Sequence, residues 1–330
     1  MLVMILITTL ASVVVSYLVA QAFGLIGRRV FSLDAKVVVI TGAGSGIGRK
    51  LAQKIFREAT DVTLALLDIN INALQTLEKD LLQSQDGEKL NKVLIYKCDV
   101  ADYRMVETIM ARVIIDVTPK HIGVLINNAG IVMGKSLEDL TPEQIQATFA
   151  VNTMAHFWTV KAALPSMKKA SEALLVTLSS VMGLTSSAGL TDYCASKAAV
   201  NAFHEALRLE LWRDNIKSIR TLLVCPAAVD TGMFAGVRNT DDWALKISRF
   251  CIPMLSEAEV TETIYHAMCR DDELLVSCFS GWRGLVLSWA PTIARVLPVP
   301  IFDFVVRLGG GLHGMDTFVG HNGTTGQDET

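Results

Sequence analysis

The sequence predicts a doubly wound α/β fold, in which helices cover both faces of a parallel sheet, with a membrane-anchor helix at the N-terminus. Short apolar runs alternate with longer segments of helical periodicity, and a glycine-rich turn follows the first of these runs. The anchor is predicted because no charged side chain occurs between Met1 and Gly27. We expect one large domain, since 330 residues can bury a substantial core.

The N-terminal segment is long enough to cross a bilayer as a helix, and its apolar residues lie on all helix faces. Ala20-Gln21-Ala22 resembles a signal-peptide cleavage site, but no basic residue precedes the apolar run, which exceeds the usual signal-peptide core. Arg28 and Arg29 on the C-terminal flank favour a cytosolic location for the following domain. We therefore predict an uncleaved anchor over residues 1–29, with a buried core helix as the alternative.

Six apolar runs of strand-like length follow the anchor. They are continuous rather than alternating, which is typical of strands buried on both faces of a parallel sheet. Residues 70–82 and 142–164, in contrast, have helical spacing. The expected strands are residues 36–40, 62–67, 93–96, 122–126, 174–178 and 219–224.

The first expected strand leads into VVVITGAGSGIGRK, where a strand, a glycine turn and the start of a helix follow one another directly. Gly42 permits a tight turn, and Gly46 and Gly48 let the backbone approach a pyrophosphate and pack against the strand. The helix start offers unpaired N–H groups and the positive end of its dipole to phosphates. This context predicts a dinucleotide site of the Rossmann type, with a simple glycine turn as the alternative.

The second expected strand ends at Asp68, twenty positions after Gly48, where an acidic residue is expected to bind the adenosine ribose. Its carboxylate would accept hydrogen bonds from both ribose hydroxyls of NAD and would repel the 2′-phosphate of NADP. Ser45 occupies a position where an NADP-binding protein can carry an arginine. The sequence therefore favours NAD, with a merely helix-capping Asp68 as the alternative.

TDYCASKAAV places Tyr193 and Lys197 four residues apart, on one face of a helix. Alone, this pattern is more typical of a solvated pair. Free tyrosine titrates near pH 10 and is therefore a poor base at neutral pH. A lysine ammonium about 4 Å away would contribute roughly 4 kcal/mol at an effective dielectric of about 20, or about three pKa units. We therefore expect a lowered Tyr193 pKa, provided that a cofactor and a partner group accompany the pair.

Further motifs occur in order along the chain, at residues 41–48 (TGAGSGIG), 98–100 (CDV), 127–130 (NNAG), 149–153 (FAVNT), 177–183 (TLSSVMG) and 193–197 (YCASK). With these motifs, residues 36–276 resemble the short-chain dehydrogenase/reductase family. Ser180 precedes Tyr193 by thirteen residues, the usual separation in that family. LLDIN, CPAAVDTGMF and the hydrophobic termini resemble its membrane-associated retinol dehydrogenase 10 and 17β-hydroxysteroid dehydrogenase 11/13 group.

The resemblance implies a catalytic tetrad of Asn152, Ser180, Tyr193 and Lys197. Tyr193 would take the alcohol proton as hydride leaves for the nicotinamide, while Ser180 would hold the substrate oxygen. Lys197 would also bind the nicotinamide ribose, and Asn152 would position a relaying water. Asn152 as a helix-bending residue and Ser180 as a strand-end cap are the alternatives. Ala227 departs from the family, which generally has glycine there.

The resemblance and the motifs also imply a set of residues that bind the dinucleotide. Asp99 and Val100 would flank the adenine, Asn127 would line the cofactor cleft, and Val229 and Thr231 would lie at the carboxamide. The full set is Gly42, Ser45, Gly46, Ile47, Gly48, Asp68, Asp99, Val100, Asn127, Tyr193, Lys197, Pro226, Val229 and Thr231.

The composition argues against two classes of binding partner, nucleic acid and metal ions. The net charge of −3 and the lack of a lysine- or arginine-rich run argue against nucleic acid. The six cysteines and six histidines show no CxxC pair and no metal-ligand spacing, so we expect reduced thiols and no metal.

The C-terminal region is expected to lie close to the substrate. Residues 284–294 are uncharged but too short to span a bilayer, and Pro291, Pro298 and Pro300 should interrupt any long helix. This segment should dip into a membrane surface or cover the pocket, with core packing as the alternative. The tail after Gly309 is expected to be loose.

These inferences divide the chain into an anchor (1–29), a Rossmann-type dehydrogenase domain (30–280) and a hydrophobic C-terminal segment with its tail (281–330). The expected function is NAD-dependent oxidation of a lipophilic alcohol, such as a retinol, hydroxysteroid or long-chain alcohol. We expect a homodimer at the endoplasmic reticulum membrane or lipid droplets, with the domain facing the cytosol. The alternatives are an NADP-dependent carbonyl reductase of lipids, which Asp68 disfavours, and a non-catalytic surface scaffold, which the intact tetrad disfavours.

Overall fold

The computed structural model describes residues 12, 30–85, 89–231, 253–270, 272–279, 281–316 and 318. The predicted anchor, residues 1–29, lies outside this part of the chain except for Ser12. Within the described residues, no helix combines the length and the apolar character needed to cross a membrane.

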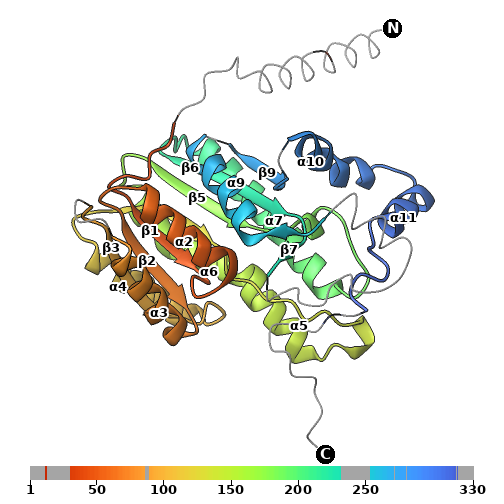
Figure 1. Ribbon diagram of the computed structural model, residues 1–330, viewed down its shortest axis with the longest axis horizontal. Coiled ribbons are helices and arrows are strands. Elements are labelled where there is room, and N and C mark those ends of the chain that lie inside the picture. The colour runs from red at the N-terminus through yellow and green to blue at the C-terminus, as the bar shows by residue number, and fades with distance from the viewer. Residues whose placement is uncertain are drawn as a thin grey trace, which may run out of the picture.

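In the part of the chain that the structure describes, seven parallel strands form the central sheet, in the order β3-β2-β1-β4-β5-β6-β9 (Figure 1). The six expected strands are all present, which confirms the parallel α/β fold in a single domain. The strands are β1 (Val37–Thr41), β2 (Thr63–Asp68), β3 (Lys92–Lys97), β4 (Ile122–Asn127), β5 (Ala173–Leu178), β6 (Ile219–Pro226) and β9 (Leu274–Ser277).

Two strand features differ from the expectation. β3 forms an edge of the sheet, and its residues are partly buried or exposed rather than buried on both faces. The four-residue strand β9 at the other edge was not predicted. A second, two-stranded sheet pairs β7 (Val229–Asp230) with β8 (Leu255–Ser256).

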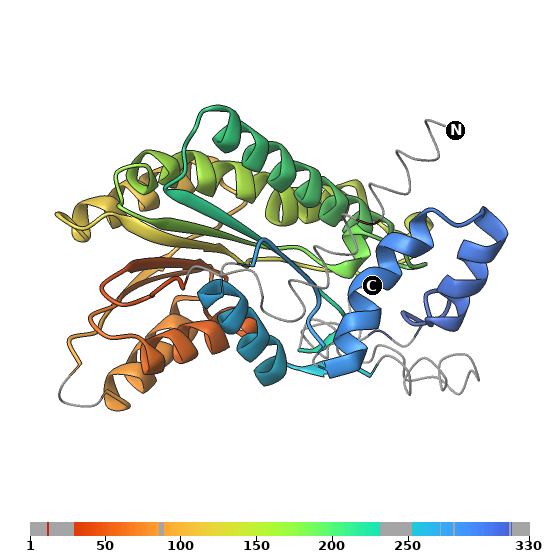
Figure 2. The same cartoon turned by 90° about the horizontal axis from the view of Figure 1, so that it is seen from above.

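Helices cover both faces of the sheet (Figure 2). The layers follow from the alternation of side chains along each strand: Val38 and Ile40 of β1 face one helix layer, while Val37 and Val39 face the other. The first layer contains α2 (Gly46–Glu58), α3 (Ile71–Gln83) and α9 (Glu257–Cys269). The second contains α4 (Tyr103–Asp116), α6 (Ala155–Met167) and α7 (Thr191–Arg213).

The segment expected as a helix over residues 142–164 is interrupted. It begins as α5 (Pro142–Phe149) with a capping box at Thr141, passes through a π-helical turn, η2 (Ala150–Met154), and continues as α6. Such turns widen the helix by one residue and occur frequently at functional sites. Asn152 lies inside this turn.

The C-terminal segment forms two helices beyond the β9 edge of the sheet, α10 (Gly281–Arg295) and α11 (Val299–Leu308) (Figure 1). The expectation that Pro291 interrupts the helix is wrong, because α10 continues through it. Pro298 and Pro300 instead flank the start of α11, where a missing N–H costs no helical hydrogen bond. The chain after Gly309 was expected to be loose, yet Met315 packs into a buried cluster with Leu190.

The strand order places a ligand site at one end of the sheet. β2 and β3 extend from one side of β1, and the chain then crosses back so that β4 pairs with the other side. In open parallel sheets, the crevice outside the carboxyl ends of the strands at such a switch point binds ligands. The glycine turn after β1 and residues 128–132 after β4 meet there.

Candidate active site

A cavity of about 760 Å³ runs along the carboxyl ends of the strands. At the β2–β3 side its wall contains Asp68, the last residue of β2, and Asp99, which follows β3. In the middle it is lined by Ser180, which follows β5, and by Pro226, the last residue of β6. Beyond β9 the wall is formed by apolar side chains of α10 and α11. The cavity therefore has one polar and one apolar end.

The glycine turn forms a cradle at the polar end, where the first N–H groups of α2 have no partner within the helix. α2 begins at Gly46, its N-cap Ser45 makes no side-chain capping bond, and its first turn contains no acidic residue. Gly48 lies so close to the Gly42 carbonyl and the Asn128 amide that a Cβ atom at this position would overlap both. This start of α2 is suited to the phosphates of a dinucleotide.

Backbone N–H groups orient the two carboxylates of the polar end. Asp68 Oδ2 accepts a hydrogen bond from the Gly44 N–H at 2.8 Å, and Oδ1 accepts one from the Asn70 N–H at 2.9 Å. Asp99 Oδ1 accepts from the Ala101 N–H at 2.9 Å. Both aspartates line the cavity, as do Val100, Ser45 and Ile47. The donor set of the cradle and these carboxylates fits an adenosine dinucleotide.

Asn127 does not lie where the sequence suggested. Its side chain is buried, its Oδ1 accepts from Thr159 Oγ1 at 2.8 Å, and it is not part of the cavity wall. The next residue, Asn128, lines the cavity, and its Nδ2 donates to the carbonyls of Thr41 and Gly42, each at 3.0 Å. Successive residues at a strand end point to opposite sides, so the doublet NN could have indicated either residue.

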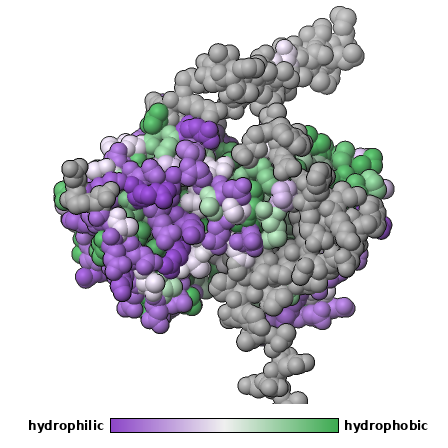
Figure 3. All heavy atoms as spheres, in the orientation of Figure 1, coloured by the Kyte–Doolittle hydropathy of each residue, from purple (hydrophilic) through white to green (hydrophobic). Residues whose placement is uncertain are grey.

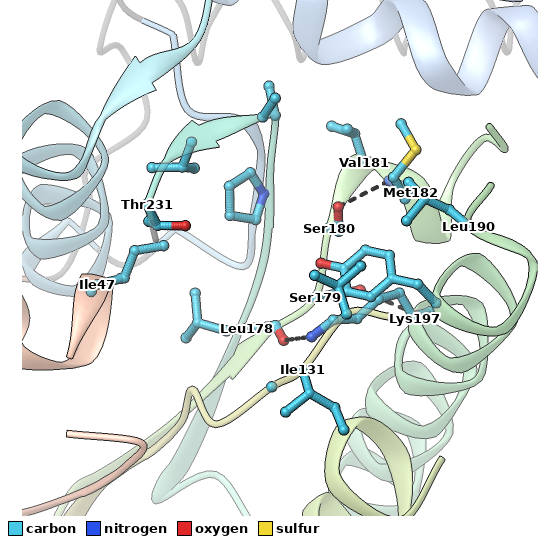
Figure 4. Close-up of a pocket in the computed structure, with 18 of the residues that line it drawn as sticks. Ile47, Ile131, Leu178, Ser179, Ser180, Val181, Met182, Leu190, Lys197 and Thr231 are labelled. Carbon is cyan, nitrogen blue, oxygen red and sulfur yellow. Dashed lines mark hydrogen bonds between the residues drawn. The ribbon is translucent and has the colours of Figure 1, made fainter. Parts of the chain in front are cut away.

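Tyr193, Lys197 and Ser180 all line the cavity. Figure 4 shows Ser180 and Lys197 on the same wall. Tyr193 and Lys197 lie one turn apart on α7, and the Lys197 ammonium is 5.8 Å from the centroid of the Tyr193 ring. Lys197 Nζ donates to the Leu178 carbonyl at 3.0 Å. Ser180 caps the short 3₁₀ turn η3 (Val181–Gly183), and its Oγ accepts from the Met182 N–H at 3.1 Å.

The pKa of Tyr193 differs from the expectation. Burial raises this pKa, and a hydrogen bond with Ser180 opposes the rise but does not reverse it. Without a bound cofactor the pKa of Tyr193 is thus raised rather than lowered, and desolvation of the phenolate is the largest cause. Burial also lowers the pKa of Lys197 to about 8, so its ammonium form still predominates at neutral pH.

Asn152 lies behind this wall rather than in it. Its side chain is fully buried and pairs with the backbone of Ile131, accepting from the N–H at 2.8 Å and donating to the carbonyl at 2.9 Å. A Cβ atom on Gly130 would stand 3.3 Å from Asn152 Oδ1 and 3.6 Å from Lys197 Nζ. Asn152 and Lys197 thus approach each other around Gly130, and Asn152 also holds the loop after β4 in place.

The remaining predicted residues lie across the cavity from the tyrosine. Figure 4 shows Thr231 and Ile47 on the wall opposite Ser180 and Lys197. Pro226 and Val229 line the same side, with Ala227, the position that departs from the family. The structure therefore brings all predicted site residues to the cavity wall except Gly48, Asn127 and Asn152, which support the wall from behind.

In agreement with the expectation that residues 284–294 cover the pocket, Leu287, Ala290 and Ala294 of that segment line the apolar end of the cavity. The sequence did not identify Leu190 and Met315, which also contribute to the apolar wall. Cys194 is buried next to Tyr193, and burial raises the pKa of its thiol, which disfavours a nucleophilic role. Among the described residues, no group of histidine, cysteine and acidic side chains is arranged to hold a metal.

Comparison with known proteins identifies relatives over most of the chain. The profile of the short chain dehydrogenases matches residues 36–242. Retinol dehydrogenase 10 of Homo sapiens is 39% identical over 243 residues, which cover 68% of this chain and 70% of that protein. Epidermal retinol dehydrogenase 2 of Homo sapiens is 33% identical over 310 residues, which cover 92% of both. The chain thus resembles the retinol dehydrogenase group.

Solved structures with the same fold contain nicotinamide dinucleotides. A short-chain dehydrogenase/reductase from Burkholderia phymatum in complex with NAD has a TM-score of 0.62 and 27% identity, over 74% of this chain and 90% of that chain. An alcohol dehydrogenase from Thermococcus sibiricus complexed with 5-hydroxy-NADP has a TM-score of 0.60 and 25% identity, over 73% and 95%. Both cofactor types therefore occur among the similar structures.

Two buried histidines behind the site should make stability depend on pH. Burial lowers the pKa of His156 to about 3 and that of His204 to about 4. The unfolded chain binds protons at these residues below pH about 6.5, whereas the folded chain does not. The contribution of these neutral histidines to the free energy of unfolding is therefore complete above pH about 6.5. It is lost as the pH falls toward 4, by about 1.4 kcal/mol per pH unit for each histidine.

The measurement is chemical unfolding at several pH values between 7 and about 4.5, followed by tryptophan fluorescence. His156→Leu should reduce the slope of unfolding free energy against pH by about 1.4 kcal/mol per unit. His121→Gln, at an exposed histidine, is the matched control. Equal slopes for wild type and His156→Leu would contradict the prediction.

Proposed function

The chain belongs to the short-chain dehydrogenase family, and on that premise we propose that it oxidises lipophilic alcohols to carbonyl compounds with NAD. It is an oxidoreductase that acts on CH–OH groups. The observation that carries the finer proposal is the single cavity, which joins a polar end at Asp68 to an apolar end at α10 and places Tyr193 between them. Retinols, hydroxysteroids and long-chain alcohols have the matching shape, with one hydroxyl on a large apolar body.

The proposed reaction separates the proton from the hydride. The alcohol loses its hydroxyl proton to the Tyr193 phenolate and its carbon-bound hydrogen as hydride, which leaves a carbonyl. When bound, NAD accepts that hydride and brings a positively charged nicotinamide ring into the site. Ser180 holds the substrate oxygen, and Lys197 binds the nicotinamide ribose and adds positive charge beside Tyr193. Asn152 holds the loop after β4 through its hydrogen bonds with Ile131 and would position a water that relays the proton outward.

The preference for NAD rests on Asp68. Its carboxylate lies at the end of β2 in the cavity wall, and its neighbour Ile69 is exposed beside it. A carboxylate here accepts hydrogen bonds from both adenosine ribose hydroxyls and repels a 2′-phosphate. No lysine or arginine side chain occurs among the residues that line this end of the cavity in the described chain.

We also propose that the enzyme works at a membrane, in the endoplasmic reticulum or on lipid droplets, with its domain in the cytosol. Residues 1–29 would anchor it, residues 30–280 would form the catalytic domain and residues 281–330 would contact lipid and substrate. Figure 3 shows hydrophobic residues gathered over the side occupied by α10 and α11. This C-terminal apolar surface consists of Trp289, Ile293, Val296, Val299, Ile301 and Phe304, which are between 46% and 81% exposed. Lipid would cover these side chains and supply a water-insoluble substrate beside the cavity.

A second exposed apolar area supports the proposed homodimer. Phe157 of α6 contacts Phe203 of α7 in a tilted arrangement, with ring centroids 4.3 Å apart, and is itself 43% exposed. Leu209 and Trp212 of α7 are also exposed. Two copies that join these helix faces would bury aromatic side chains of the kind that dominate stable interfaces.

The first test concerns the tyrosine. Tyr193→Phe should lower kcat by about 10²- to 10⁴-fold, because it removes the proton acceptor, while the Kd for NAD changes less than about twofold. Tyr103→Phe, on the exposed start of α4, is the matched control. Oxidation of a panel of retinoid, steroid and fatty alcohols should be followed by NADH absorbance. Near-normal turnover of Tyr193→Phe would refute the mechanism.

The second test concerns the cofactor. Asp68→Ala combined with Ile69→Arg should shift the ratio of NADP to NAD affinity by at least about tenfold toward NADP, because a repulsive charge is replaced by an attractive one. Asp68→Asn keeps an acceptor for the Gly44 N–H and separates the charge effect from a loosened glycine turn. Wild-type protein that binds NADP more tightly than NAD would overturn the assignment.

The third test concerns the membrane. Deletion of residues 1–29 should weaken binding to phospholipid vesicles, and a residual fraction should persist through the C-terminal apolar surface. Adding Ile293→Glu and Phe304→Glu to the deletion should abolish that fraction in flotation assays. Ile115→Glu, at an equally exposed apolar position on α4, should not. Full-length protein found entirely in the soluble fraction would contradict the anchor.

A further inference from the structure

The chain after α11 crosses back over the catalytic helix. We call residues 309–316 with Phe318 the C-terminal strap. The Gly311 carbonyl accepts two hydrogen bonds from the loop before α7, from the Ala188 N–H at 2.8 Å and from Ser187 Oγ at 2.9 Å. These bonds tie the strap to the segment that leads into Tyr193.

Two apolar side chains fix the rest of the strap. Met315 is buried with Leu190, Tyr193 and Cys194, and Phe318 packs on the same cluster. Each rests on a glycine with positive φ: a Cβ atom on Gly189 would stand 3.0 Å from the Met315 Cβ, and one on Gly134 would overlap the Phe318 ring. A larger residue at either glycine would be strained and would push the strap away.

We infer that the C-terminal strap closes a subsite for the apolar body of the substrate and that Met315 is a specificity-determining residue. This inference rests on the proposed function, because it assumes that the alcohol reacts at Tyr193. Met315 packs against Tyr193 and also lines the cavity, so a chain attached to the reacting carbon must pass it.

The chemistry of the wall defines the ligand. Besides Met315, the apolar end is formed by Leu287, Ala290 and Ala294 of α10 and Val306 of α11, together with strap glycines. None of these side chains carries a charge or a hydrogen-bonding group, so a polar chain would lose its hydration without compensation. The flexible thioether of Met315 adapts to chains of differing shape. The subsite therefore suits a long aliphatic or polyene body, whereas a short alcohol reaches Tyr193 without touching most of it.

Cys194 reports on the strap independently of catalysis. Its thiol is buried in the cluster with Met315 and interacts with the backbone of Ser187, in the loop that Gly311 holds. Opening of the strap should therefore expose this thiol to a maleimide, and an alcohol bound in the subsite should protect it.

The experiment compares wild type, Met315→Ala and Leu312→Ala in the full-length holoenzyme. Leu312 belongs to the strap but is 42% exposed, which makes it the matched control. Oxidation of butanol and hexadecanol, NAD affinity, and Cys194 labelling with and without hexadecanol are measured, with the labelled peptide identified by mass spectrometry.

Met315→Ala should lower kcat/KM for hexadecanol about tenfold. Its kcat/KM for butanol and its Kd for NAD should stay within about twofold of the wild-type values, and Cys194 labelling should become several-fold faster. Leu312→Ala should resemble wild type. An active Met315→Ala enzyme with unchanged hexadecanol kinetics would overturn the specificity role, while the proposed function would stand. A wild-type enzyme that oxidises neither alcohol would count against the proposed function. In that case, absence of hexadecanol protection at Cys194 would also overturn the subsite, and protection would support it.

Discussion

The contact between the ends of β1 and β4 is the constraint on which the site depends. Asn128 donates two hydrogen bonds to Thr41 there, from its backbone N–H to Thr41 Oγ1 and from its Nδ2 to the Thr41 carbonyl, each at 3.0 Å. The same amide reaches Gly42, and Gly48 lies against both, which requires a residue without a side chain. This packing sets the start of α2 and the path of residues 129–132 together. The phosphate cradle and the loop that Asn152 holds are thus two parts of one rigid unit.

The sequence was sufficient for the sheet because burial on both faces leaves long apolar runs, as in β4 and β5. Features of the structure that leave no long apolar run could not be predicted from the sequence. β9 is short and its Leu274 is 57% exposed, so it resembles a loop. The π-helical turn at Asn152 adds one residue to a helix without disturbing its apolar spacing enough to be recognised. Side chains alternate along β4, so Asn127 points into the core and Asn128 into the cavity. Which of the two points where depends on the residue at which the strand ends, and sequence defines strand ends poorly.

The full apolar end of the cavity, beyond the predicted segment 284–294, could not be derived from sequence for a different reason. Its wall combines the consecutive segments α10, α11 and the strap with the loop before α7, which is far from them in the sequence. The glycines after α11 suggested a loose tail, but the order of the strap comes from partners at Ser187, Gly189 and Gly134. Sequence motifs indicate the cofactor side of the cavity because its backbone geometry requires particular residues, such as glycine, at fixed positions. The other side requires only apolar surface, which many residues supply.

The burial of Tyr193 also couples the ionisation of its hydroxyl to the binding of the dinucleotide. Because desolvation holds its hydroxyl in the neutral form, ionisation needs an additional positive charge nearby. By thermodynamic reciprocity, the ionised side chain must in turn strengthen the binding of whatever supplies that charge. The oxidised dinucleotide carries it on the nicotinamide ring, and the reduced one does not. With Tyr193 as the proposed proton acceptor, a rise in pH favours the oxidised over the reduced dinucleotide at this site, so that pH and redox state act on the same residue.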